Sequence, residues 1–306
     1  MSLQQISPAL IAALEEQLAR ALGERVSLAA FAEHKGVADE TLKLAARGAR
    51  GEAIGVVLYA PEIAPRLIAR GCERGRAARA ALGEELGRVV VTARAEGEHA
   101  GRTWALMPQA RVLGHGLAAR AERRWLAGAL LAWLREVARR AAGAADESAR
   151  SCYGEALAYA ESEPALGDEI RAGARAARAR IAAAAWRPRH VVMHGDLWAG
   201  NVLGAPSAAP FSRRFVLIDW DTSRVSGFPI LDLVRAARSF GVSRSRLGRE
   251  IAAHSSALGW NRDVARGALI AALGHTGLAR ENFPLARYAE MARGALASFD
   301  AAATGS

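Results

Sequence analysis

The sequence predicts an α+β protein in which a small sheet-rich lobe precedes a larger, mainly helical lobe. Three observations lead to this prediction. Short apolar runs separated by glycine-containing turns, a pattern typical of antiparallel strands, fill residues 26–60 and 88–108. Apolar residues recur at helical spacing over most of the chain after Gly114. A short strand–loop–strand segment at 190–219 interrupts this helical region.

The first lobe is predicted to hold an N-terminal helix, five strands and a second helix between them. Residues 5–22 have helical spacing of apolar side chains and lack the basic start of a signal peptide. Strands are expected within "VSLAAFAEHKG", "ETLKLAARG" and "AIGVVLYAP", a helix after Pro65, and a strand pair in "GRVVVTARAEG" and "GRTWALMPQA". The last strand runs into Pro108, where we expect a hinge. We therefore expect a first lobe of residues 1–108 and a second lobe of residues 109–306.

The second lobe is predicted to be helical except for the segment at 190–219. Long helices are expected at 115–142 and 147–186, the second with a break near "SEPALGD". Further helices are expected near 230–240, 243–258, 261–275 and 284–303.

Composition and charge narrow the class of protein. The chain has 306 residues, a net charge of +10 and 41 basic residues, of which only Lys35 and Lys43 are lysines. The arginines are spread along helices instead of forming one tract, so we expect no nucleic-acid partner. The longest apolar run, "LAGALLAWL", is about half of what a membrane span needs. We expect a cytoplasmic protein without a membrane span, and two cysteines argue against a disulfide framework.

Chemistry-bearing residues gather in "HVVMHGDLWAGNVLG" and "FVLIDWDTS". If the two apolar strands pair as a hairpin, Asn201 and Asp219 come to the same end and can hold Mg²⁺, which takes one or two protein ligands and completes its shell with water and phosphate oxygens. Asp196 then faces the open side, where it can accept a proton from an attacking hydroxyl. This set suits phosphoryl transfer, in which positioning and charge neutralisation supply most of the catalysis.

Three neighbouring residues have more than one possible role. We expect His194 to brace the loop by hydrogen bonds, because an Asp base two residues later leaves a catalytic His little to do. Trp198 is either a wall of the substrate site or a packing anchor. Asp221 is either a further carboxylate for the metal or a surface residue.

The motif "HGDLWAGNVL" followed by "VLIDWD" resembles the aminoglycoside phosphotransferase and choline kinase-like families, and "HGDLWAGN" also resembles fructosamine kinases. The resemblance is close over residues 190–235. It implies a bilobal protein-kinase-like fold with a small antiparallel-sheet N-lobe and a larger helical C-lobe. It also implies Asp196 as the catalytic base, His194 as a loop brace, and Asn201 and Asp219 as Mg²⁺ ligands.

The resemblance extends more loosely beyond this motif. Asp232, in "GFPILDLVRAARS", has the position of the acid that anchors the catalytic loop in such families. The segment "LMPQA", with Met107 and Gln109, has the position of the hinge that meets adenine. Glu73 has the position of the helix glutamate that orients a strand lysine in the first lobe.

The chain departs from the family pattern at that lysine, which belongs near Leu58 in "VVLYA" and is absent there. Three explanations remain open. Lys43 can reach the phosphates from the neighbouring strand, because adjacent strands lie only about 4.8 Å apart. Arg70 can replace the lysine if "RLIARG" forms the strand. The nucleotide-binding lobe can also have decayed, leaving a weak kinase or a pseudokinase.

The sequence thus predicts a phosphotransferase that uses ATP and Mg²⁺ to phosphorylate a hydroxyl or amine of a small molecule. The alternative is a catalytically inactive kinase-like binding module, which the missing strand lysine favours. A net charge of +10 disfavours cationic acceptors such as aminoglycosides. A neutral sugar, a sugar–lipid headgroup or another hydroxylated metabolite fits better. The oligomeric state is left open.

Overall fold

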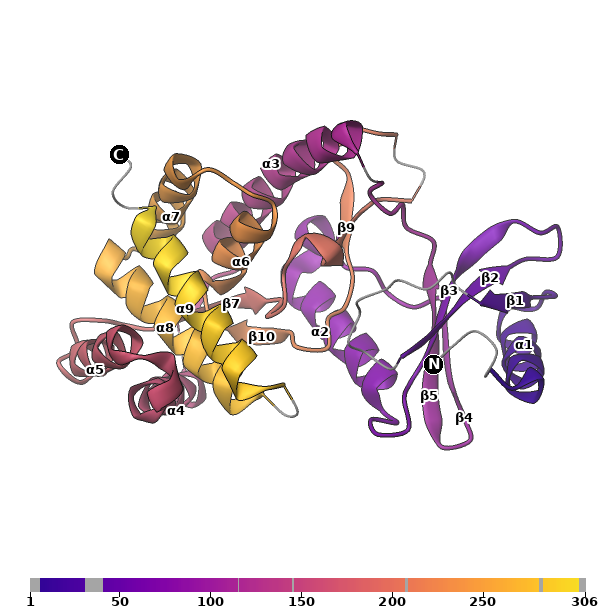
Figure 1. The fold of residues 1–306 in the computed structure, drawn as a ribbon, viewed down its shortest axis with the longest axis horizontal. Coiled ribbons are helices and arrows are strands. Elements are labelled where there is room, and N and C mark those ends of the chain that lie inside the picture. The colour runs from indigo at the N-terminus through magenta and orange to yellow at the C-terminus, as the bar shows by residue number, and fades with distance from the viewer. Residues whose placement is uncertain are drawn as a thin grey trace.

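The computed structural model describes residues 6–30, 41–114, 116–144, 146–206, 209–280 and 283–302. A sheet with one covering helix forms one end of the molecule, and a group of helices forms the other end (Figure 1). The predicted mixture of a small antiparallel sheet and a larger helical part is confirmed. None of the helices in the described ranges is long and apolar enough to cross a bilayer.

The sheet at the first end is antiparallel and has the strand order β1–β2–β3–β5–β4. Its strands are β1 (Ser27–Ala30), β2 (Leu42–Arg47), β3 (Ala53–Tyr59), β4 (Ala95–His99) and β5 (Arg102–Pro108). Alternate side chains on one face, among them Leu44, Val57 and Trp104, pack with Leu14 and Leu18 of α1 (Pro8–Leu22). The predicted N-terminal helix is therefore confirmed, and it covers this face. The segment 31–40, with the predicted Lys35–Gly36 turn, lies outside the described residues.

The opposite face of the sheet packs against α2 (Leu67–Gly87). Ile68 and Cys72 of this helix lie with Leu58 and Met107 of the sheet. The C-terminal half of α2 instead contributes Ala78, Leu82 and Leu86 to the large core of the helical end. Because α2 packs in both cores, it fixes the position of the sheet relative to the helical part of the molecule. The lobe boundary at 108/109 stays a prediction.

The predicted strand in "GRVVVTARAEG" is wrong over most of its length, because β4 begins only at Ala95. The apolar residues before it serve a different purpose. Val90 forms a parallel bridge with Leu217, and the backbone N–H of Val91 donates to the Leu217 carbonyl. Val89 and Val90 are buried in the large core. This apolar run therefore ties the first sheet to a strand of the second part.

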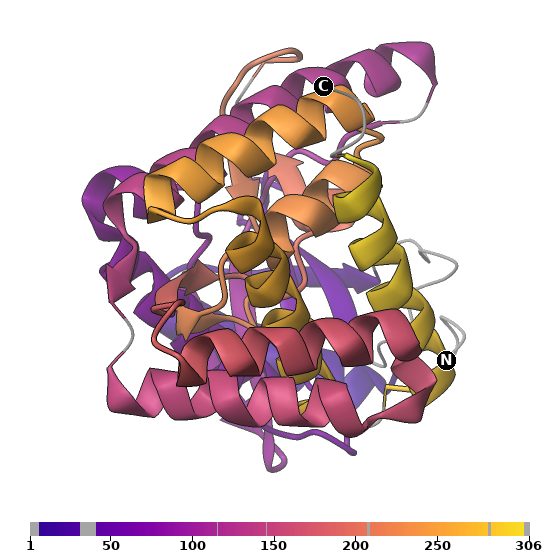
Figure 2. The same ribbon diagram turned by 90° about the vertical axis from the view of Figure 1, so that its left-hand side faces the viewer.

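The helical end contains α3 (Leu117–Arg140), α4 (Glu147–Ser162), α5 (Asp168–Ala182), α6 (Leu231–Ser239), α7 (Arg244–Leu258), α8 (Arg262–Leu278) and α9 (Leu285–Ala301). The predicted break near "SEPALGD" is confirmed, since a short 3₁₀ helix, Pro164–Leu166, separates α4 from α5. Figure 2 shows α4 and α5 lying side by side across one face, with α8 behind them. The predicted helices from residue 230 onward are also confirmed within a few residues.

Two short sheets lie within the helical part. The strand β7 (Arg189–Met193) pairs with β6 (Gly143–Ala144) on one side and β10 (Arg224–Gly227) on the other. The strand β8 (Val202–Gly204) pairs with β9 (Phe215–Leu217). The expected hairpin between the strand before Asp196 and the strand before Asp219 is therefore wrong. The strand that pairs with β9 comes after the loop and is only three residues long, too short to stand out in the sequence.

Candidate active site

The site begins at a tight turn directly after β7. Gly195 has φ 84°, and a Cβ at this position would lie 2.8 Å from the carbonyl oxygen of Thr222. Both the positive φ and the close carbonyl oxygen exclude a side chain at Gly195. The hydroxyl of Thr222 donates to the carbonyl of His194 at 2.9 Å. The turn is thus clamped against the segment that follows Asp219.

His194 is buried, and both of its ring nitrogens have partners. Nε2 donates to the carbonyl of Ile218 at 2.9 Å, and Nδ1 lies 3.4 Å from the backbone nitrogen of Asp196, which donates to it. The ring also packs on Trp220, with 4.7 Å between the ring centres. These contacts connect the loop after β7 with the end of β9. They favour the predicted role of His194 as a brace, since neither nitrogen points to an incoming substrate.

Asp232 lies in the first turn of α6, and its carboxylate accepts two backbone hydrogen bonds. The donors are the N–H groups of His194, at 2.6 Å, and Gly195, at 3.0 Å. Burial raises the pKa of the Asp232 carboxyl, and the nearby His194 together with these bonds acts in the opposite direction. This geometry matches the anchoring position expected for Asp232.

The β8–β9 hairpin brings Asn201 and Asp219 to one end. Asn201 directly precedes β8, and its carbonyl accepts a hydrogen bond from the N–H of Ile218 at 3.1 Å. Its side-chain Nδ2 donates to the backbone carbonyl of Asp196 at 2.9 Å and lies 3.3 Å from Asp196 Oδ2. Asp219 is exposed and has φ 63°, a left-handed conformation that Asp tolerates better than most residues. Asp196 and Asn201 are therefore joined by hydrogen bonds, and Asp219 directly follows Ile218, whose N–H donates to the Asn201 carbonyl.

The donor set at this end of the hairpin fits Mg²⁺. One amide and one carboxylate, from Asn201 and Asp219, supply the oxygen ligands this hard cation prefers, and Mg²⁺ is usually held by only one or two protein side chains. In the described ranges, no cluster of three or more His, Cys, Asp or Glu side chains could hold a metal ion. A candidate metal site therefore rests on these two residues alone.

Asp221 is half-buried, and its carboxylate has a partner on α2. Its carboxylate accepts hydrogen bonds from Arg70 Nε at 2.6 Å and Arg70 Nη2 at 2.9 Å. Arg74 of the same helix donates to the Asp221 backbone carbonyl. The premise that Arg70 lies on a strand is wrong, because it lies in the first turn of α2. The helix shared by both cores is thereby joined to the loop that carries Asp219.

Two further side chains near the loop are Arg235 and Trp198. Arg235 of α6 forms an ion pair with Asp196 through Nη2 and Oδ1. No motif marks Arg235 in the sequence, although its position three residues after Asp232 places it on the same side of α6 and could have revealed it. Trp198 is 49% exposed, with its ring against Gly200, which argues against a packing anchor.

The candidate nucleotide residues lie on the sheet and on the segment that leaves it. Lys43 of β2 is paired directly with Leu58 of β3. Glu73 is exposed on α2, and the helix residues that contact the loop are Arg70 and Arg74 instead. The structure thus does not bring Glu73 to the loop.

The hinge candidates lie at the end of β5. Met107 is half-buried there, paired with Val56. Gln109 is exposed one residue beyond β5, with Nε2 3.4 Å from the carbonyl of Ala110. Arg111 then exchanges two backbone hydrogen bonds with Gly204, at 3.0 and 2.9 Å. The segment joining the two lobes is thus fixed to the β8–β9 hairpin that holds Asn201 and Asp219.

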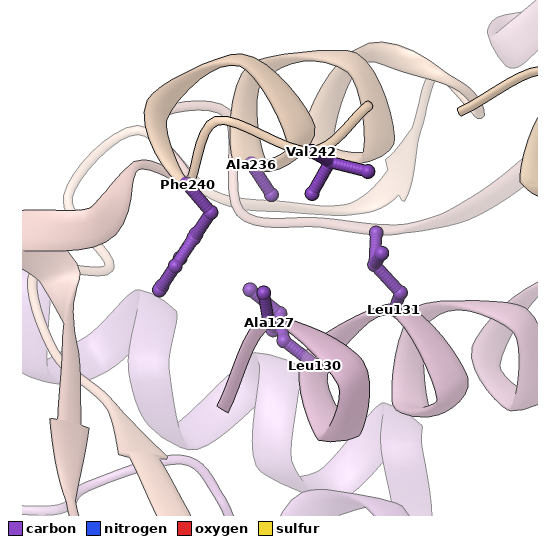
Figure 3. Close-up of a pocket in the computed structure, with 6 residues that line it drawn as sticks. All are labelled: Ala127, Leu130, Leu131, Ala236, Phe240 and Val242. Carbon is purple, nitrogen blue, oxygen red and sulfur yellow. The ribbon is translucent and has the colours of Figure 1, made fainter. Parts of the chain in front are cut away.

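A small hollow elsewhere in the helical part has no candidate residue in its lining. Figure 3 shows that it lies between α3 and the end of α6, with Phe240 and Val242 facing Ala127 and Leu131. All of its lining residues are apolar. It is a feature of core packing and offers no chemistry.

Solved structures resemble this chain in fold. A thermostable mutant of the aminoglycoside phosphotransferase APH(4)-Ia, solved with ADP and hygromycin B, is 15% identical with a TM-score of 0.56 and covers 96% of this chain and 100% of its own. The choline kinase LicA from Streptococcus pneumoniae is 14% identical with a TM-score of 0.54, and the match covers 95% of this chain and 99% of LicA. A putative fructosamine-3-kinase from Haemophilus somnus is 9% identical with a TM-score of 0.55, and the match covers 94% of this chain and 96% of the kinase. These likenesses confirm the predicted bilobal protein-kinase-like fold.

The sequence itself gives a more direct assignment. No curated protein matches the chain with significance. A model of the phosphotransferase enzyme family matches residues 63–268, about two thirds of the chain, from just before α2 into α8. This range includes the loop after β7, the β8–β9 hairpin and the anchoring turn of α6. The chain belongs to the phosphotransferase enzyme family.

Proposed function

We propose that this protein transfers the γ-phosphoryl group of ATP to a hydroxyl or amine of a small molecule. One observation carries the proposal: Asp196 and Asn201 are joined by hydrogen bonds, and Asp219 directly follows Ile218, whose N–H donates to the Asn201 carbonyl at the end of the β8–β9 hairpin. A base and two metal-binding side chains at one place are what phosphoryl transfer requires of a protein.

Asp196 is the proposed base. The oxygen or nitrogen of the acceptor forms a bond to the γ-phosphorus, the bond from that phosphorus to the β–γ bridging oxygen breaks, and ADP leaves with the electron pair. The proton of the acceptor passes to the Asp196 carboxylate. Asn201 holds this carboxylate through its amide, and His194 and Asp232 hold the backbone on its N-terminal side.

Asn201 and Asp219 would hold Mg²⁺, which neutralises charge on the phosphates of a bound nucleotide. Lys43 is the proposed cation for the phosphates from the sheet, and Met107 and Gln109 are the proposed neighbours of the nucleobase. Arg70 supports this arrangement indirectly, because it binds Asp221 two residues after Asp219.

The second candidate function is a kinase-like module that binds a ligand without catalysis. It is favoured by one observation: β3 presents the apolar Leu58 where the family pattern has its lysine, packed in a cluster with α2. The two candidates differ in what Asp196 does. A catalytic protein loses turnover in Asp196→Asn, whereas a binding module keeps its biochemical behaviour.

Melting temperatures measured with millimolar Mg·ATP and Mg·GTP test the proposal. A ligand at one hundred times its Kd stabilises the folded state by about 2.7 kcal/mol, so the shift is measurable. Asp219→Asn should lose the Mg²⁺-dependent part of the shift, while Asp196→Asn should keep the shift and lose ADP formation. Asp168→Asn, on the exposed start of α5, is the matched control. The proposal is refuted if neither nucleotide shifts the melting temperature of the unaltered protein.

A further inference from the structure

Arg235 of α6 lies beside the proposed base. Its Nη2 donates to Oδ1 of Asp196, while the amide of Asn201 lies 3.3 Å from Oδ2 of the same carboxylate. Both carboxylate oxygens are therefore engaged. The side chain of Arg235 is 18% exposed and that of Asp196 is 36% exposed, so a ligand can reach the pair from solvent.

The hydrogen bond to Asp196 uses one nitrogen, Nη2, of the Arg235 guanidinium. A guanidinium has five N–H donors in a planar fork that matches carboxylate and phosphate oxygens. An anionic group on the acceptor can therefore bind the other donors of Arg235, which fixes the acceptor beside Asp196.

The charges around Asp196 favour the same kind of ligand. Asp221, the acid next to the proposed metal ligand Asp219, is already bound by Arg70. Next to the base itself, the fixed cation is Arg235. An acceptor with an ammonium group beside its reacting hydroxyl would meet this guanidinium and be repelled, whereas an anionic acceptor would be attracted.

We propose that Arg235 is a specificity-determining residue of the acceptor site, and that the acceptor carries a carboxylate or phosphate close to the hydroxyl that is phosphorylated. This inference rests on the proposed function, since it names the substrate class of the same site. It differs from what the net charge of the chain suggests, because it requires an anionic acceptor and not only a non-cationic one.

Matched acceptors that differ in charge test the inference. One set is glucosamine, glucose, glucuronate and glucose 6-phosphate, and the other is ethanolamine, glycerol, glycerate and glycerol 3-phosphate. ADP formation with Mg·ATP is measured for each. We expect an anionic member to have the highest kcat/KM in at least one set, at least tenfold above the neutral member, and the cationic member to have the lowest.

Variants of Arg235 then connect this preference to the residue. Arg235→Gln should lose at least tenfold in kcat/KM for the anionic acceptor, mainly through KM, and much less for the neutral one. Arg235→Lys should recover part of the loss. The matched control is Arg238→Gln, one turn further along α6, where the guanidinium lies against Gly294 and donates to the carbonyl of Met291. Melting temperatures show that each variant is folded.

The inference and the proposed function can fail separately. The inference is overturned if the protein binds Mg·ATP but prefers the neutral or cationic members, if no anionic member gives turnover, or if Arg235→Gln lowers kcat for all acceptors equally. The last result would make Arg235 a positioning residue for Asp196. Absence of any Mg·ATP binding would instead refute the proposed function.

Discussion

Lys43 lies directly opposite Leu58 in the antiparallel pair of β2 and β3. Directly opposite residues of antiparallel strands project from the same face of a sheet. Leu58 packs in the cluster with α2, whereas the neighbouring residues Leu44 and Val57 face α1. Lys43 thus leaves the sheet from the face where the family lysine is expected, displaced by one strand, or about 4.8 Å. Of the three explanations for the missing lysine, this geometry favours relocation.

If Lys43 has taken over the phosphate contact, Lys43→Met should raise the Kd for Mg·ATP at least tenfold. The loss of one ammonium from a phosphate site removes a charge-assisted hydrogen bond worth about 1.5–3 kcal/mol. Lys43→Arg should lose less, because the charge remains. Titration calorimetry with Mg·ATP provides the measurement, and Arg47→Gln, on an exposed residue of the same strand, is the control.

A variant that exchanges the two positions makes this test sharper. Lys43→Met combined with Leu58→Lys returns the ammonium to the strand where the family has it, and we expect it to recover part of the nucleotide affinity. Unchanged affinity in Lys43→Met would exclude Lys43 as the residue that binds the phosphates.

The bidentate contact between Arg70 and Asp221 should couple α2 to the active-site loop. In a double-mutant cycle, Arg70→Gln and Asp221→Asn should each lower the stability of the folded protein. Their effects should be non-additive by about 1 kcal/mol, because both remove the same two hydrogen bonds. Each should also weaken Mg·ATP binding through the displacement of Asp219. Denaturant unfolding and calorimetry measure the two effects, and fully additive losses would show that the pair has no role in coupling.

The sequence was most informative where residues act over short distances along the chain. The spacing of Asp196 and Asn201 and the apolar strand before Asp219 were enough to predict that Asn201 and Asp219 lie at the same end of a strand pair, even though the predicted strand pairing was wrong. Pairing over three residues, as between β8 and β9, leaves no periodic signal. The residues that the sequence did not reveal, such as Arg235, depend on contacts between distant elements.

The same limit explains two other differences. The run Val89–Val91 has the composition of a strand, but tertiary contacts with β9 and the large core decide its structure. Asp221 could be interpreted as a metal ligand because nothing in the sequence shows that Arg70, 151 residues earlier, lies beside it. Local patterns predicted the elements and the centre of the site, while its charge partners required the structure.

Asp232 should hold the loop after β7 in position without taking part in the reaction itself. Asp232→Ala leaves the N–H groups of His194 and Gly195 without an acceptor, which costs about 1–3 kcal/mol for each buried group. Asp232→Asn should destabilise the protein less than Asp232→Ala, because the amide keeps one oxygen that can accept a hydrogen bond. Burial disfavours the charged form of Asp232 and so raises its pKa, and the neutral amide avoids this cost. Denaturant unfolding should rank the proteins as unaltered, Asn, Ala. Equal stability of the unaltered and Ala proteins would contradict the anchor.

His275 should make the protein less stable at acidic pH. His275 of α8 accepts a hydrogen bond from Arg224 at 2.9 Å through Nε2, and its Nδ1 lies 3.8 Å from Cys152 Sγ. Burial, with a further effect of Arg224, lowers the pKa of His275 to about 4. In the unfolded chain, a histidine titrates near its ordinary value of about 6.5. Between these two values the unfolded state binds more protons, so the free energy of unfolding falls as pH falls.

We therefore expect the unaltered protein to lose stability between pH 7.5 and pH 5 by more than His275→Gln does. One pKa unit corresponds to about 1.4 kcal/mol. The side chain is only partly buried, and solvent screening reduces its contribution, so the expected difference is about 1 kcal/mol. His254, whose pKa is also lowered by burial, is present in both proteins and cancels from the comparison. Urea unfolding at the two pH values measures the difference, and identical losses in both proteins would show that His275 does not carry this pH dependence.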